Sequence, residues 1–220
     1  MAEASVKICG LQDVEVLKSM INLPVDHIGF LFAKSKRQVT ADQAAALIPI
    51  LKEWQSAEKP ESVGVFVNPT IEELSDILQK ASLDIIQLHG QESPEFCREV
   101  KRRFGVKVFK VLSVKQDSNK EGFDLEEYKG ALDGLLLDTY DPLYGGGSGQ
   151  TFDWKQILPY QMWTKQEGIP LIIAGGLHPE NVGDLLENFQ PDGVDVSSGV
   201  ETDGLKDIAK IRAFVERVKR

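Results

Sequence analysis

Two side chains that can exchange protons end short apolar runs far apart in the chain. Cys9 ends the run from Val6, and Asp138 ends the run from Gly134. A thiolate and a carboxylic acid are a suitable base and acid for moving a proton between two atoms of a substrate. Each also has a structural alternative, because most free cysteines are small buried hydrophobes and aspartate is common in turns. Their positions in the fold therefore decide between the two interpretations.

The segment 170–201 has the pattern of a phosphate-binding site. It contains two apolar runs, each followed by a loop of small residues, with Gly175 and Gly176 in the first loop and Ser198 and Gly199 in the second. Backbone N–H groups that open a helix bind anions, and two such loops after the last two strands form the phosphate site of many (β/α)8 barrels. A glycine pair alone usually only turns the chain, so this interpretation requires the rest of the chain to form a barrel.

The rest of the chain alternates short apolar runs with amphipathic helical segments. Uninterrupted apolar strands between helices indicate a parallel sheet that helices cover. The expected strands are 6–9, 27–32, 62–67, 84–89, 107–112, 134–138, 171–173 and 194–196. The sequence therefore predicts an α/β fold, a single (β/α)8 TIM barrel with a parallel eight-stranded core, in one domain over residues 1–220. An open doubly wound sheet is the alternative, but the first turn, Cys9-Gly10-Leu11, lacks its G-x-G-x-x-G pattern.

Cap residues mark where several helices should begin. Serine or threonine before a helix accepts hydrogen bonds from its first turn. The expected caps are Thr40, Thr70 and Ser93. The last two helices are expected to begin near Pro179 and at Leu205, and the glycine-rich connection 139–151 is long enough for a functional lid.

The composition favours a small-molecule partner. A net charge of −9 over 220 residues argues against a nucleic-acid partner or an anionic membrane surface. No apolar run reaches membrane-spanning length and the N-terminal segment lacks a signal-peptide pattern, so we expect a cytoplasmic protein. Two cysteines are too few for a disulfide scaffold, and three histidines lack metal-ligand spacing, so we expect no metal. The helical faces show no additional apolar stripe, which favours a monomer.

Short motifs in a fixed order run through the whole chain. They are KICGL at 7–11, KSKR at 34–37, GVFVN at 64–68, QLHG at 87–90, LLDT at 136–139, YGGGSGQTFDW at 144–154, AGGL at 174–177 and VDVSSGVE at 194–201. Together they resemble the phosphoribosylanthranilate isomerase family of tryptophan biosynthesis, although Gly147 adds one glycine to the family's pattern. The resemblance implies a single barrel that converts N-(5-phosphoribosyl)anthranilate to 1-(2-carboxyphenylamino)-1-deoxyribulose 5-phosphate, the third step from chorismate to tryptophan. It implies an Amadori rearrangement without a cofactor.

The resemblance also implies a role for each candidate residue. Asp138 would be the general acid, Cys9 the general base, and Arg37 the partner of the anthranilate carboxylate. His89 and Asp195 are secondary candidates for a sugar hydroxyl or for the shape of the mouth. The structural alternatives are that Arg37 is an ordinary solvated loop residue and that His89 only closes a strand. The phosphate of the phosphoribosyl substrate is implied to lie on Gly175, Gly176, Ser198 and Gly199.

Two other functions remain open on the sequence. One is a different phosphoribosyl or indole-glycerol phosphate enzyme on the same barrel, because a fold does not fix a function. Such an enzyme should lack the Cys9 and Asp138 pair, which is present. The other is a catalytically silent barrel that binds a phosphosugar as a sensor or partner.

Lys7 has the same strand parity as Cys9, which predicts that both face the barrel interior. A buried ammonium needs a partner, and Asp195 on the neighbouring last strand is the expected one. This ammonium should also favour the Cys9 thiolate. The alternative is that Lys7 reaches solvent at the bottom rim.

Overall fold

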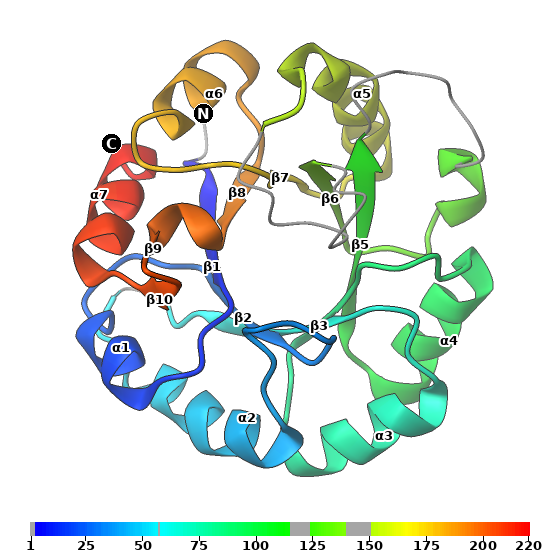
Figure 1. Cartoon of the computed structure of the whole chain (residues 1–220). Helices are drawn as coiled ribbons and strands as arrows, with labels where there is room; N and C mark the ends of the chain where they lie inside the picture. Colours follow the sequence, from blue (N-terminus) through cyan, green and yellow to red (C-terminus); the bar gives the residue numbers. More distant parts are fainter. Residues whose placement is uncertain (1–2, 57, 115–123, 140–150) are drawn as a thin grey trace.

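The strands close into one parallel barrel, which confirms the predicted fold class (Figure 1). The structure is a computed structural model that describes residues 3–56, 58–114, 124–139 and 151–220. Each strand pairs with the next in chain order, and the eighth pairs with the first. The strands are β1 (Ser5–Cys9), β2 (His27–Leu31), β3 (Glu61–Phe66), β4 (Ile85–Leu88), β5 (Lys107–Val114), β6 (Gly134–Thr139), β7 (Leu171–Ile173) and β8 (Gly193–Val196).

Helices form a ring around this barrel (Figure 1). The α-helices are α1 (Val14–Ser19), α2 (Ala41–Leu47), α3 (Ile71–Lys80), α4 (Pro94–Phe104), α5 (Ile157–Glu167), α6 (Val182–Phe189) and α7 (Ile208–Val218). Short 3-10 helices are η1 (Ile48–Glu53), η2 (Leu125–Tyr128), η3 (Trp154–Gln156) and η4 (Ser198–Val200). The three expected caps are confirmed: Thr40 and Thr70 form capping boxes, and the Ser93 side chain accepts from the Phe96 N–H. Most of the expected lid falls in 140–150, outside the described residues.

Two expected helix starts are wrong. The α6 helix begins at Val182 rather than near Pro179, because Asn181 bonds backwards to the His178 N–H and the Gly176 carbonyl. The α7 helix begins at Ile208, capped by Asp207. The residues before it form a small antiparallel hairpin, β9 (Glu201–Thr202) and β10 (Leu205–Lys206). Asp203 and Gly204 turn this hairpin with positive φ angles of 53° and 80°.

Apolar residues fill two layers, one inside the barrel and one between the sheet and the helices. The interior cluster is Val63, Ile85, Phe109, Val111, Leu136, Ile172 and Ala174. Val6 and Ile8 belong to the outer layer. Because side chains alternate along a strand, Lys7 and Cys9 therefore face the interior, as predicted. Among the described residues, no helix is both long and apolar enough to span a membrane.

Candidate active site

The candidate acid and base lie on the same rim of the barrel. Cys9 ends β1 and Asp138 lies next to the end of β6, and parallel strands carry their C-terminal ends to one face. His89 directly follows β4, and the two small-residue loops directly follow β7 and β8. The rim therefore brings together the residues that the sequence selected from strand ends.

Cys9 is buried at this rim, at 6% exposure. Its partner on β2 is Gly29, where a Cβ atom would come within 2.7 Å of the Cys9 sulfur. Gly10 follows with a φ of +84°, and a Cβ there would come within 2.7 Å of Arg37 Cδ. Two glycines thus provide the space that the thiol and the Arg37 side chain occupy.

Lys7 lies inside the barrel one pleat below Cys9 and is fully buried. Its Nζ atom donates to Asp195 Oδ2 at 2.9 Å, and the two residues are register partners across β1 and β8. The predicted pair is confirmed, and the alternative of a lysine at the bottom rim is wrong. Burial acts to lower the Lys7 pKa, but the charge of Asp195 and the nearby Cys9 raise it overall, so the ammonium persists.

The pKa of Cys9 is shifted away from the thiolate, whereas the sequence predicted that Lys7 would favour the thiolate. Burial raises the pKa of the thiol, and this exceeds the opposing effects of the Lys7 and Lys206 ammonium groups. Lys7 does favour the thiolate, as predicted, but the balance favours the thiol in the unliganded protein. The sequence identified the neighbouring charge but not the extent of burial.

Asp138 and His89 approach each other from β6 and from the end of β4. Asp138 Oδ2 lies 3.5 Å from His89 Nε2, and Asp138 Oδ1 accepts from the Thr139 N–H at 2.7 Å. Burial, followed by repulsion from Lys110 and Lys7, lowers the His89 pKa to about 4. His89 is therefore neutral near pH 7, when one ring nitrogen can donate and the other accept.

A buried ion pair that the sequence analysis missed holds the loop carrying His89. Lys110 and Glu92 lie 3.0 Å apart, with side chains 1% and 2% exposed. The ammonium also donates to the carbonyls of Leu88 and Gly90, and Glu92 Oε1 accepts from the Asn68 N–H. This network joins the middle of β5 to the ends of β3 and β4, beside His89. The signal was present in the sequence, as a lysine in the middle of an apolar strand.

The small-residue loops after β7 and β8 pack directly against each other. Gly175 and Gly176 have φ angles of +83° and +62°. A Cβ atom on Gly199 would come within 1.9 Å of the Leu177 carbonyl oxygen, so only glycine allows this contact. Ser198 and Gly199 open η4, and the first N–H groups of a helix have no acceptor within it. The geometry suits an anion between the two loops.

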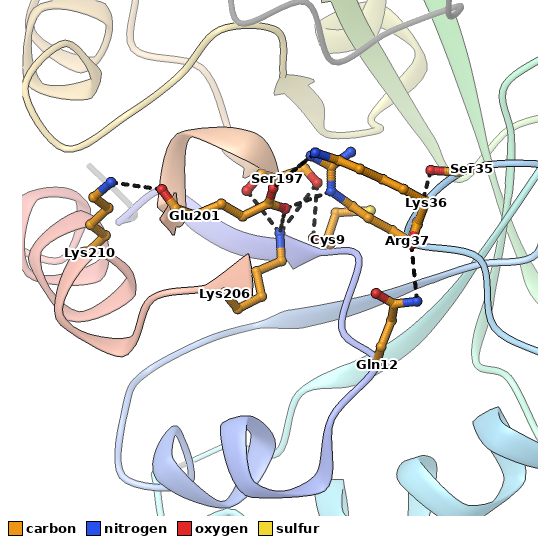
Figure 2. Close-up of polar contacts among 9 residues, drawn as sticks. All are labelled: Cys9, Gln12, Ser35, Lys36, Arg37, Ser197, Glu201, Lys206 and Lys210. Carbon is orange, nitrogen blue, oxygen red and sulfur yellow. Dashed lines mark hydrogen bonds and ion pairs between the residues drawn. The ribbon is translucent and has the colours of Figure 1, made fainter. Parts of the chain in front are cut away.

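Arg37 reaches from the loop after β2 to the hairpin after β8. Its Nε and Nη2 atoms donate to the two carboxylate oxygens of Glu201 at 2.6 and 2.8 Å. Lys206 bonds the same carboxylate at 2.9 Å, and Figure 2 shows the three side chains converging beside Cys9. Arg37 is thus a half-buried ion-pair partner rather than a solvated loop residue. Glu201 and Lys206 were not among the expected site residues, because the sequence pattern does not predict the hairpin that carries them.

Among the described residues, no three acidic, histidine or cysteine side chains converge as metal ligands would. The arrangement of a closed (β/α)8 barrel with titratable side chains and small-residue loops on one rim is that of the (β/α)8-barrel enzymes. A family model described as N-(5'phosphoribosyl)anthranilate (PRA) isomerase matches residues 6–217. The chain belongs to this family.

Curated relatives and solved structures agree with this assignment. N-(5'-phosphoribosyl)anthranilate isomerase from Brevibacillus brevis is 47% identical over 213 residues, which cover 97% of this chain and 92% of the relative. Phosphoribosyl anthranilate isomerase from Thermotoga maritima is similar in structure, with a TM-score of 0.77, 38% identity and 98% of each chain covered. A structure of phosphoribosyl anthranilate isomerase in complex with reduced 1-(o-carboxyphenylamino)-1-deoxyribulose 5-phosphate has a TM-score of 0.74, 35% identity and 98% coverage of each chain.

Proposed function

We propose that the chain converts N-(5-phosphoribosyl)anthranilate to 1-(2-carboxyphenylamino)-1-deoxyribulose 5-phosphate, a step of tryptophan biosynthesis, without a cofactor. One observation carries the proposal: Cys9, Asp138 and the two small-residue loops lie on the rim of a barrel whose sequence belongs to this isomerase family. A thiol and a carboxyl group supply the base and acid that an Amadori rearrangement requires.

In this mechanism Asp138 donates its proton to the ring oxygen of the ribose. The C1–O bond breaks, and the nitrogen lone pair forms an iminium ion at C1. Cys9, as thiolate, then removes the proton from C2, and the electron pair of that C–H bond forms the C1–C2 double bond of an enolamine. The enolamine takes up a proton at C1 as its C2 hydroxyl becomes the ketone, which gives the aminoketose.

The raised pKa of Cys9 gives the substrate a part in generating the base. The thiol is favoured in the unliganded protein because burial outweighs the nearby ammonium groups. An iminium ion adjacent to the sulfur adds a positive charge to those of Lys7 and Lys206, which favours the thiolate. The thiolate form of Cys9 is therefore most populated when the substrate is in its ring-opened form.

The two ends of the substrate are assigned to different parts of the rim. The phosphate lies between the loops that contain Gly175, Gly176, Ser198 and Gly199. Arg37 binds the anthranilate carboxylate, because its contact with Glu201 uses only the Nε and Nη2 edge of the guanidinium. The other edge still offers donors on Nη1 and Nη2. His89 serves Asp138 or a sugar hydroxyl, whereas Asp195 acts mainly as the partner of Lys7.

The direct test is to mix the purified protein with N-(5-phosphoribosyl)anthranilate and follow the intrinsic fluorescence of this substrate. We expect the fluorescence to decay catalytically, and inorganic phosphate to slow the decay by competition. Binding without decay would indicate a silent phosphosugar-binding barrel. Neither binding nor decay would indicate an enzyme for another phosphosugar.

The oligomeric state and the cellular location belong to the same proposal. The sequence favours a cytoplasmic monomer, whereas one Thermotoga maritima structure describes monomers generated from a dimeric protein. Sedimentation velocity at several concentrations tests the monomer, and a single species of about twice the chain mass would contradict it.

A further inference from the structure

Lys206 connects the start of the phosphate loop to the carboxylate that holds Arg37. It comes from β10, in the hairpin after η4, and its side chain is 6% exposed. Its Nζ atom donates to the Ser197 carbonyl at 2.8 Å, at the start of the phosphate loop. The same atom donates to Glu201 Oε1 at 2.9 Å. The Ser197 hydroxyl in turn donates to the Cys9 carbonyl at 3.2 Å.

Glu201 continues this connection to Arg37. Its side chain is also 6% exposed, and both of its oxygens are bound by the guanidinium. Burial acts to raise the Glu201 pKa, but hydrogen bonds from Arg37 and Lys206 lower it overall, so the carboxylate stays ionised. A planar two-bond contact of this kind fixes both the position and the plane of the guanidinium.

Figure 2 shows the connection as a continuous set of contacts from Arg37 through Glu201 and Lys206 to Ser197, above Cys9. Two positive groups share one carboxylate, so the cluster keeps a net positive charge beside the rim. Lys36 adds a longer contact of 4.0 Å from an exposed position. An unsupported arginine side chain loses many rotamers when it binds a ligand. The two bonds to Glu201 restrict Arg37 before binding, so these contacts favour an orienting role for Glu201.

We propose that Glu201 and Lys206 are positioning residues that hold the Arg37 guanidinium at a fixed place relative to the phosphate loop, and so match the site to a ligand with a carboxylate at one end and a phosphate at the other. This inference rests on the proposed function. It adds that carboxylate recognition depends on two residues that do not themselves contact the ligand. Glu201 acts on the carboxylate end, and Lys206 acts on both ends.

The experiment compares two ligands and inorganic phosphate by isothermal titration calorimetry. The first ligand is reduced 1-(o-carboxyphenylamino)-1-deoxyribulose 5-phosphate, and the second is the same molecule without its carboxyl group. The ratio of their Kd values measures carboxylate recognition. We expect a ratio of about tenfold or more for the unmodified protein, from hydrogen bonds to a charged group.

Glu201→Gln should reduce this ratio to about threefold or less, with no effect on phosphate binding. Lys206→Met should reduce the ratio and also weaken phosphate binding, whereas Lys206→Arg should restore part of both. Lys210→Met is the matched control, because the Lys210 ammonium bonds the Glu201 backbone carbonyl, at 2.7 Å, rather than its carboxylate. It should leave all three Kd values within about twofold. In an Arg37→Ala background, Glu201→Gln should reduce the ratio no further.

A Glu201→Gln variant that keeps the full ratio would overturn the inference, as would a further loss in the Arg37→Ala background. A merely structural role predicts equal weakening of both ligands, and that result would also overturn it. Circular dichroism melting identifies any variant that does not fold. If Lys206→Met does not fold, Glu201→Gln and Lys206→Arg still test the inference. A ratio near one in the unmodified protein would contradict the Arg37 assignment in the proposed function itself, before any variant is made.

Discussion

Lys110 and Lys7 are both fully buried and make ion pairs of similar length. The two pairs differ in how many hydrogen bonds surround them. Lys110 Nζ has Glu92 at 3.0 Å and three backbone carbonyls as acceptors. Lys7 Nζ has Asp195 at 2.9 Å, and Asp195 Oδ1 has no hydrogen-bond partner among the described residues. The first pair is saturated with hydrogen bonds, and the second is not.

Strand parity explains where each pair acts. Phe109 and Val111 belong to the interior cluster, so Lys110 between them faces the helices, where it holds loops together. Lys7 faces the interior, beneath Cys9, where its positive charge acts on the thiol. Lys110, whose ammonium has a full set of acceptors, stabilises the loops that it contacts. Lys7, whose charge lies beside the Cys9 thiol, is expected to influence the chemistry of the rim.

Removal of Lys110 from its buried pair with Glu92 should have the largest effect on stability. Lys110→Met leaves the Glu92 carboxylate buried without its cation, which should lower the free energy of unfolding by about 3–5 kcal/mol. Urea unfolding measures this loss. The pH at which activity appears should not change in the folded variant. A loss below about 1 kcal/mol would mean that the pair behaves as a surface contact.

Lys7→Met should have a smaller effect on stability and a distinct effect on catalysis. The Asp195 side chain is 9% exposed whereas that of Glu92 is 2% exposed, so its unpaired charge is better solvated and the expected loss is about 3 kcal/mol. Without the ammonium the Cys9 pKa rises further, so the acidic limb of the pH–rate profile should move to higher pH. Lys18→Met, on the exposed surface, is the control. An unchanged acidic limb together with an unchanged free energy of unfolding would show that Lys7 influences neither Cys9 nor the stability of the barrel.

Acid should destabilise the fold through His89. Its pKa is about 4 in the fold and about 6.5 when unfolded, so both states are neutral above pH 6.5. As the pH falls from 6.5 towards 4, the unfolded chain takes up the proton first, and stability is lost. His89→Gln should reduce the loss between pH 7 and pH 5 by about 2 kcal/mol, and His27, whose pKa is also lowered, remains in both proteins. Equal losses in the variant and the parent would show that His89 does not carry this effect.

The barrel and the Lys7 pair were predictable because they depend on regular patterns, the alternation of side chains along a strand and the closure of the sheet. Alternation along β1 fixes the side on which Lys7 lies, and closure of the barrel makes β8 its neighbour. The loop contacts could not be found in this way. Arg37 lies in a loop that has no strand register to Glu201, and the hairpin that presents Glu201 depends on a left-handed turn at Asp203 and Gly204.

The sequence pattern predicts which charged residues are neighbours more readily than it predicts how deeply a group is buried. Lys7 was recognised as a neighbour of Cys9, yet the direction of the Cys9 pKa follows from how completely the fold covers the sulfur. Lys110 and Glu92 show the same limit, because the partner of a buried lysine came from a loop rather than from a strand. Roles at the rim therefore depend on packing that no local pattern contains.

We expect Cys9 and Asp138 to transfer protons on a ligand that other groups bind. The decisive measurement is the kcat of Cys9→Ser and Asp138→Asn with N-(5-phosphoribosyl)anthranilate, alongside the Kd of the reduced product. Asparagine keeps an oxygen for the Thr139 N–H, so the fold of β6 should persist. We predict that kcat falls by about 10² to 10⁴ in each variant, while Kd stays within about threefold. A variant with the parent kcat would exclude its residue from the mechanism and contradict the account.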